Sequence, residues 1–369
     1  MTPNKGPAPA DYTLIITILF LVFCGLVMIY SASAIWAERH LGQPLYFLKR
    51  QIFWAAFGLI IMGLVSRLNY NLYREKIGLI LGITTIALFL ALLGHKVGGA
   101  RRWIKIGPIG LQPSEFAKLS CVIFLSYYLD KKRSRLRSPV SSIILPALAL
   151  SPIIFLIAKE PDLGTPVLIF TVSLGLLFVA GVRLRHILSA LSLSIPVIAY
   201  ELIRYPYRRT RILNFLSPFH DAKNTGYQLA QSLLAVGSGG LFGKGLGASN
   251  IKLMYLPTPH TDFIFPILCE ELGLAGALGL LFLFVFFTIQ GMRIARNAPN
   301  LFGSLLAAGI TWTIALQAFF NMARSLGLLP TKGIPIPFVS FGGSSLLASL
   351  IGIGILLNIS RQTKTTAIL

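Results

Sequence analysis

The sequence predicts an all-α polytopic membrane protein, in which residues 1–369 form a single membrane domain. Hydrophobic residues make up 55% of the chain and charged residues only 12%, whereas soluble domains carry about 25% charged residues. The apolar residues form long runs, and each run has about the 20 residues that a helix needs to cross a bilayer. The net charge of +21 does not indicate a nucleic-acid-binding protein, because the basic residues are not gathered in a soluble domain.

The apolar runs predict about ten transmembrane helices. The first run is longer than the apolar region of a cleavable signal peptide, so we interpret it as a span. No internal repeat is found, so an inverted-repeat transporter is not indicated. The predicted spans are 12–31, 46–66, 77–94, 113–130, 140–158, 164–181, 185–203, 263–290, 302–323 and 339–360.

The distribution of Lys and Arg sets the predicted orientation. Short loops rich in basic residues, such as 131–137, are expected in the cytoplasm. This places 1–11 and 361–369 there as tails and makes 204–262 a large extracytoplasmic loop between the seventh and eighth helices. The outer segments nevertheless carry as many basic residues as the inner ones. Either an anionic group is bound at the outer face, or the long loop carries its charge without such a role.

A polar motif opens the predicted fourth helix. Arg101 and Arg102 precede it, and Ser114 stands where it can cap the helix. Glu115 and Lys118 are three residues apart, so they are neighbours on a helix. Ionisable residues in a span are costly and tend to mark functional sites, so we expect this pair to line a polar cavity near the outer end. The alternative is an internal ion pair that steadies the bundle.

Two further motifs lie in the predicted outer segments. Glu160 and Asp162 frame a tight turn and are expected to form a solvated turn with a helix cap. The glycine-rich segment 237–247 allows backbone amides to approach an anion closely. Lys244 is followed by glycine, so there is no Walker A motif and an ATP site is not indicated.

Asp262 lies where the loop 204–262 meets the eighth helix. It is a good N-cap, but in a basic and partly dry cavity it can also stay ionised and accept a proton from a sugar hydroxyl. Glu270, about 80° further round the helix, is expected on the same face, and Glu271 against another helix. No second His lies at ligand spacing from His260, so no protein-held metal site is predicted.

The segment before the last helix, 329–345, contains three prolines and ends in Gly-Gly-Ser-Ser. This composition predicts irregular backbone that dips into protein and not into lipid. Ser344 and Ser345 line this entrance, although small residues there can also serve close helix packing alone.

Taken together, these motifs resemble the SEDS (FtsW/RodA/SpoVE) family of bacterial cell-envelope proteins over about residues 12–362. The matching motifs occur in the family's order: Arg-Trp-Ile before Gln-Pro-Ser-Glu-Phe-Ala-Lys, Glu-Pro-Asp-Leu-Gly-Thr, the glycine-rich segment, His-Thr-Asp-Phe-Ile-Phe, and Pro-Phe-Val-Ser-Phe-Gly-Gly-Ser-Ser. Thr331-Lys332-Gly333 is more similar to the FtsW branch, which acts in division, than to the RodA branch, which acts in elongation.

The resemblance implies a ten-span peptidoglycan glycosyltransferase of the bacterial cytoplasmic (inner) membrane that polymerises lipid II at the outer face during septal cell-wall synthesis. It implies Asp262 as the catalytic residue and general base. External cations would stabilise the pyrophosphate leaving group, and a divalent cation, Mg²⁺ or Mn²⁺, would assist. The expected substrate-binding residues are Glu115, Lys118, Asp162, Arg101, Arg102, Arg208, Arg211, Lys332, Ser344 and Ser345.

The implied partners are lipid II, a class B penicillin-binding protein transpeptidase and other membrane proteins of the divisome. Two alternatives stay open. A lipid II flippase would need charged residues along a path from the cytoplasm, whereas Glu115, Asp162 and Asp262 are all expected near the outer ends of helices. A non-catalytic division scaffold predicts that Asp262→Ala leaves growth unaffected.

Overall fold

Helices make up nearly all the regular structure of the computed structural model, which describes residues 11–94, 96, 100–107, 109–160, 162, 164–204, 215, 227–250, 261–330 and 333–362. The short 3₁₀ helix η1 (Arg133–Arg135) and the π-helical segment η2 (Val140–Ile144), which continues into α6, connect α5 to α6. The helices are α1 (Tyr12–Leu41), α2 (Tyr46–Val65), α3 (Asn71–Glu75), α4 (Ile77–Leu93), α5 (Pro113–Lys131), α6 (Leu145–Lys159), α7 (Gly164–Val179), α8 (Leu184–Arg204), α10 (Tyr227–Ser238), α11 (Ile264–Asn297), α12 (Leu301–Ser325) and α13 (Gly343–Arg361).

The predicted all-α membrane fold is confirmed. Six helices of the described residues are long and apolar enough to cross a membrane, namely α1, α2, η2 with α6, α11, α12 and α13. The apolar helices α4 and α7 are shorter. Each predicted span coincides largely with a helix, while the total of ten crossings stays a prediction.

Helix ends differ from the predicted ones where hydropathy is a poor guide. α1 and α11 continue to Leu41 and Asn297, beyond their most apolar stretches. α13 begins at Gly343 and not at residue 339, because the backbone before it is irregular: Phe338 adopts a positive φ of 68°. Few residues other than glycine tolerate that conformation.

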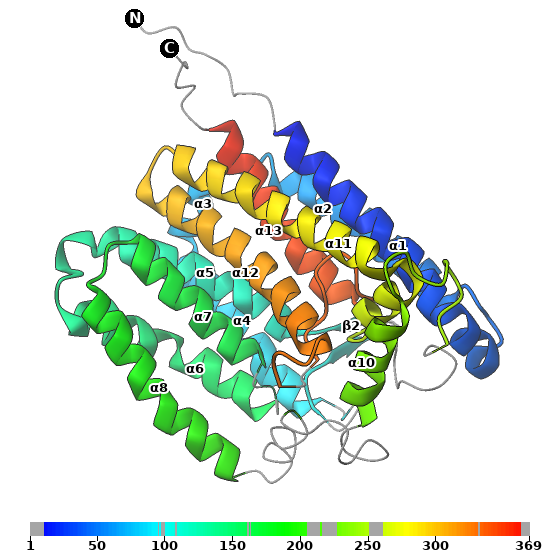
Figure 1. Ribbon diagram of the computed structural model, residues 1–369. Helices are drawn as coiled ribbons and strands as arrows, with labels where there is room; N and C mark the ends of the chain where they lie inside the picture. Colours follow the sequence, from blue (N-terminus) through cyan, green and yellow to red (C-terminus); the bar gives the residue numbers. More distant parts are fainter. Residues whose placement is uncertain are drawn as a thin grey trace, which may run out of the picture.

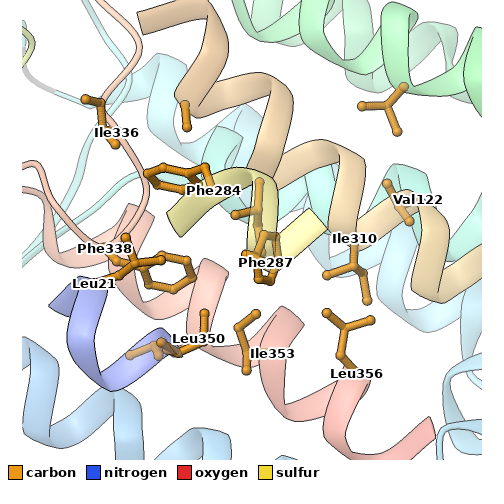
Figure 2. Packing of buried hydrophobic residues seen from close by; sticks show 14 of the residues in the cluster. Leu21, Val122, Phe284, Phe287, Ile310, Ile336, Phe338, Leu350, Ile353 and Leu356 are labelled. Atoms are coloured by element: carbon orange, nitrogen blue, oxygen red, sulfur yellow. The ribbon is translucent and has the colours of Figure 1, made fainter. Parts of the chain in front are cut away.

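The bundle is built around α12 and α13 (Figure 1). α13 packs against α2, α5, α11 and α12, while α12 also contacts α5 and α7. Figure 2 shows Phe287 of α11, Ile310 of α12 and Ile353 of α13 pointing into one apolar core, with Phe338 beside them. The core thus fixes α11, α12 and α13 relative to one another.

The two ends of the bundle carry different helix ends and different polar contacts. The start of α1 and the end of α13 lie at the same end (Figure 1). At that end Arg293 pairs with Asp11 at 3.3 Å, and the Asn358 amide donates to the carbonyl of Ser66 at 3.0 Å. The opposite end carries the first turns of α5, α11 and α13, and we call it the site end.

α11 is broken near its start, where Gly273 has φ 66° and ψ −161°. Such a break leaves backbone groups without helical partners, which is costly in a membrane. Segment 239–247, just after α10, supplies the missing partners. The N–H groups of Lys244 and Gly245 donate to the carbonyls of Glu270 and Glu271, and those of Leu274 and Ala275 donate to the carbonyls of Gly240 and Leu241.

The glycines of this segment therefore serve close backbone packing, and the amides of Lys244 and Gly245 are occupied by α11 and not offered to an anion. A Cβ on Gly239 would lie 1.9 Å from the carbonyl oxygen of Cys269. The Glu270 carboxylate adds to the contact, because it accepts from the Lys244 ammonium at 2.8 Å and from the Ser249 hydroxyl at 2.6 Å.

Gly239→Ala is expected to destabilise the protein by about 1–3 kcal/mol, because the new methyl group overlaps backbone that cannot move cheaply. Gly237→Ala is the matched control, since a Cβ there meets no atom within 4 Å and the residue lies in α10, where Ala is favoured by about 0.5–1 kcal/mol. Thermal unfolding of both purified variants measures the difference. Equal midpoints for the two variants would contradict this role of the segment.

Candidate active site

The site end brings together segments that are far apart in the sequence. Strands β1 (Ile104–Ile106) and β2 (Ile109–Leu111) form an antiparallel hairpin that leads into α5. The Ser344 hydroxyl of α13 accepts from the backbone N–H of Gln112 at 2.9 Å and donates to the carbonyl of Gly110 at 3.4 Å. Ser344 thus fastens the hairpin to the start of α13.

The last part of the segment before α13, residues 336–340, is buried in protein, as its composition predicts. Ile336 and Val339 are almost fully buried. Gln51 of α2 holds the backbone of this segment, because its amide donates to the carbonyl of Ser340 at 3.4 Å and accepts from the N–H of Gly342 at 3.3 Å. The irregular backbone is therefore satisfied by a neighbouring helix.

Glu115 and Lys118 are neighbours, as their spacing predicts. Their charged groups lie 2.8 Å apart and are both buried, and the Lys118 ammonium also donates to the Gln317 side-chain oxygen at 2.6 Å. With Thr313 they line a cavity of about 30 Å³ between α5, α12 and α13, which has room for water. The predicted cap was wrong: Gln112 is the N-cap residue and Pro113 occupies the first turn, where its fixed φ suits a helix start, so Ser114 lies inside the helix.

Asp262 lies two residues before Ile264, the first residue of α11, and is partly exposed. The N-cap residue is Phe263, without a side-chain capping bond, so the Asp262 carboxylate does not act as the cap of α11. It lies against Gly333, where a Cβ would be 1.9 Å from Oδ2. Its backbone carbonyl accepts from the Asn321 amide at 3.1 Å and from the Arg324 guanidinium.

A row of polar side chains on α12 holds these segments, and sequence reasoning missed most of it. Gln317, Asn321 and Arg324 share one helix face and are 2%, 0% and 3% exposed. Gln317 donates to the carbonyl of Pro335 at 3.0 Å and Asn321 to that of Ile334 at 2.5 Å. Arg324 lies over the Phe263 ring at 4.6 Å. The sequence signal for this row is its spacing: the three polar residues are four and three positions apart within an apolar span, which places them on one helix face.

The turn between α6 and α7 carries two buried carboxyl groups. Asp162 caps α7, because it accepts from the N–H of Thr165 at 3.1 Å and from its hydroxyl at 2.9 Å. Glu160 is fully buried and not solvated, and its carboxyl oxygens have no hydrogen-bond partner among the described residues. Burial and the nearby charge of Asp162 raise the pKa of Glu160 to about 8, against the opposing effects of Ser114 and Arg102.

The remaining predicted site residues fall into three groups. Arg101 is exposed and Arg102 partly exposed just before β1. The Ser345 hydroxyl accepts from the Gln317 amide at 3.4 Å. Outside the described residues are Arg208, Arg211, Lys332 and His260, together with most of the predicted loop 204–262; its described part contains α10 and the segment packed on α11.

The two acidic residues of α11 point to different neighbours. Glu271 accepts from the Ser31 hydroxyl of α1 at 2.7 Å, so it meets another helix as predicted. Glu270 bonds to Lys244 and Ser249, so its carboxylate belongs to the packing of segment 239–247 and not to the surroundings of Asp262.

A family model for the FtsW/RodA/SpoVE group, described as cell cycle protein, matches residues 12–365. The chain belongs to the FtsW/RodA/SpoVE family. This confirms the resemblance seen in the motifs.

Similar proteins cover almost the whole chain. One from Trichlorobacter lovleyi, named probable peptidoglycan glycosyltransferase FtsW, is 40% identical over 97% of this chain and 94% of its own length. Stage V sporulation protein E of Bacillus subtilis is 41% identical over 98% and 99% of the two chains.

Solved structures show the same fold. A chain from a peptidoglycan synthase complex, described as coordinating polymerization and crosslinking, superposes with a TM-score of 0.79 at 28% identity and covers 95% of this chain and 98% of its own. The rod-shape-determining protein RodA of Thermus thermophilus gives a TM-score of 0.71 at 27% identity over 96% and 98% of the chains.

Glu160→Gln is expected to remove a pH dependence of stability. The carboxyl has a pKa of 4.5 when unperturbed and about 8 in the folded protein, so the folded state keeps a proton that the unfolded state loses in this range. The free energy of unfolding of the wild type therefore falls as the pH rises from about 5 to about 8. Gln stays neutral, so the variant should match the wild type near pH 4 and exceed it near pH 9.

Unfolding midpoints of the two purified proteins across this pH range measure the effect. Asp162→Asn serves as a comparison, because it weakens the cap of α7 and removes one of the two causes of the raised pKa. It should therefore reduce this pH dependence, while burial of Glu160 keeps part of it. Parallel curves for wild type and Glu160→Gln would contradict a proton held by Glu160.

Proposed function

We propose that this protein is a peptidoglycan glycosyltransferase that polymerises lipid II into glycan strands at the outer face of the bacterial cytoplasmic membrane during septal synthesis. The observation that carries the proposal is the placement of Asp262. Its partly exposed side chain lies at the site end, and buried side chains of α12 hold its backbone. Relatives of about 40% identity named as FtsW glycosyltransferases support the reaction and the branch.

In the proposed reaction, Asp262 is the general base. It takes the proton from the 4-hydroxyl of the acceptor GlcNAc as that oxygen bonds to the anomeric carbon of the donor MurNAc. The bond from this carbon to the pyrophosphate breaks, and undecaprenyl pyrophosphate leaves with the electron pair. A single displacement inverts the anomeric configuration, and alignment of the two substrates supplies much of the rate.

Cations at the site end would stabilise the charge that develops on the pyrophosphate. Arg101 and Arg102 are the described candidates, and Arg208, Arg211 and Lys332 are proposed from the sequence alone. Mg²⁺ or Mn²⁺ bound to the pyrophosphate would add positive charge. The described residues contain no group of three His, Cys, Asp or Glu side chains that could hold such an ion, so none of the steps above is assigned to it.

Other predicted substrate-binding residues are engaged within the protein. Lys118 bonds to Glu115 and Gln317, and Asp162 caps α7. We propose that these residues, with Ser344 and Ser345, form a polar wall at the site end, where they would orient sugar and phosphate groups.

A class B penicillin-binding protein is the proposed partner, together with other membrane proteins of the divisome. The similarity to a chain of a synthase complex that coordinates polymerization and crosslinking supports it. The common position of the start of α1 and the end of α13 (Figure 1) supports two cytoplasmic termini. The distribution of basic residues in the short loops supports the same orientation.

The deciding experiment is polymerisation of labelled lipid II by the purified protein, with and without a class B partner. Asp262→Asn keeps the size of the side chain but removes the base, so we expect a rate loss of about 10²–10⁴-fold. Full activity of the variant would overturn the assignment of Asp262. Failure of the wild type to form glycan, even with partner and divalent cation, would favour a flippase or a scaffold, which a lipid II translocation assay separates.

Gly333→Ala is expected to reduce kcat by about 10²-fold without unfolding the protein. The new methyl group would overlap Oδ2 of Asp262. The Asp262 side chain can rotate to avoid this overlap, but its carboxylate then leaves the position that catalysis needs. Gly342→Ala is the control, because a Cβ there meets only the Cβ of Ser345 at 3.7 Å. Equal kcat values for both variants would show that the carboxylate position at Gly333 does not matter.

A further inference from the structure

The polar row of α12 requires an explanation beyond helix packing. Polar side chains inside a membrane-spanning helix are costly and tend to be functional. Gln317, Asn321 and Arg324 bond to two stretches of irregular backbone outside α12. One stretch, 261–263, carries Asp262, and the other, 333–336, leads to α13.

Asn321 bonds to both stretches with one amide group. Its Nδ2 donates to the carbonyl of Asp262 at 3.1 Å and to the carbonyl of Ile334 at 2.5 Å. Gln317 donates to the second stretch, at the carbonyl of Pro335, and Arg324 donates to the first, at the carbonyl of Asp262. A planar amide with two N–H groups sets the separation of its two acceptors.

This separation decides where the Asp262 carboxylate lies. Oδ2 of Asp262 rests against the Cα of Gly333, the residue directly before Ile334. A shift of one stretch relative to the other would therefore move the carboxylate away from this contact. Proton abstraction depends on distances within hydrogen-bond reach, and a displacement of about 1 Å can cost about 10²-fold in rate.

We propose that Asn321 is a positioning residue, which orients the Asp262 carboxylate by holding the two stretches at a fixed separation. Asn321 is fully buried and acts through Asp262, without contact to substrate. The inference rests on the proposed function, because it matters for turnover only where Asp262 is the base. It predicts a loss in kcat with little change in KM.

Asn358 provides a matched control at the opposite end of the bundle. It is also buried, and its amide bonds two backbone groups, donating to the carbonyl of Ser66 at 3.0 Å and accepting from the N–H of Tyr70 at 2.9 Å. Asn358→Ala therefore removes a comparable pair of bonds without touching the surroundings of Asp262.

The test is steady-state polymerisation of labelled lipid II by the full chain with its class B partner, comparing wild type, Asn321→Ala, Asn358→Ala and Asp262→Asn. We expect Asn321→Ala to lower kcat by about 10²-fold with KM within about twofold of the wild type. Asn358→Ala should keep kcat within about twofold of the wild type, even if its unfolding midpoint falls as far as that of Asn321→Ala. Asn321→Ser, which can reach only one of the two carbonyls, should give an intermediate kcat and replaces Asn321→Ala should that variant not fold.

Three results would overturn the inference: an unchanged kcat in Asn321→Ala or Asn321→Ser, a loss that lies in KM, or an equal loss of kcat in Asn358→Ala. The Asp262→Asn arm separates this from failure of the proposed function. An inactive Asp262→Asn with a fully active Asn321 variant overturns only the positioning role, whereas an active Asp262→Asn overturns the assignment of the base itself.

Discussion

Backbone and side-chain polar groups at membrane depth must find partners within the protein, and this constraint organises the site end. The stretches that flank the site are not regular helix: one, 261–263, carries Asp262 ahead of α11, and the other, 333–336, leads to Phe338, which has a positive φ. α12 compensates with three buried polar side chains that bond to both stretches. Gln51 of α2 does the same for the last residues before α13.

The break in α11 is governed by the same constraint. Its carbonyl and N–H groups around Gly273 are paired by segment 239–247, and the Glu270 carboxylate gathers Lys244 and Ser249 onto this contact. α11 is therefore supported on one side by α10 with its following segment and on the other by α12. The start of α11, and Asp262 with it, is held in a frame that the apolar core alone would not provide.

Much of the fold could be predicted because hydropathy reports directly on membrane crossing. The Glu115–Lys118 pair was predictable for a similar reason, since residues three apart on a helix must be neighbours. The partners of Gln317 and Asn321 were not predictable, because they lie far away in the sequence and are backbone carbonyls without a residue signature. The glycines of 239–247 fit an anion site equally well by composition; only the positive φ of Gly273 explains why they pair with α11. Glu160 was expected in water because turns usually lie there, but it is fully buried, and Asp162, Ser114 and Arg102 are close enough to affect its pKa.

On this interpretation, the polar row of α12 holds the stretches 261–263 and 333–336 as one unit. Hydrogen exchange of backbone amides, followed by mass spectrometry on wild type and Asn321→Ala, tests this most directly, since local opening is seen without any need for substrate. In Asn321→Ala we expect faster exchange in both stretches together, with the peptides around Ser66 and Tyr70 unchanged. Faster exchange in only one stretch, in neither, or equally throughout the bundle would contradict it.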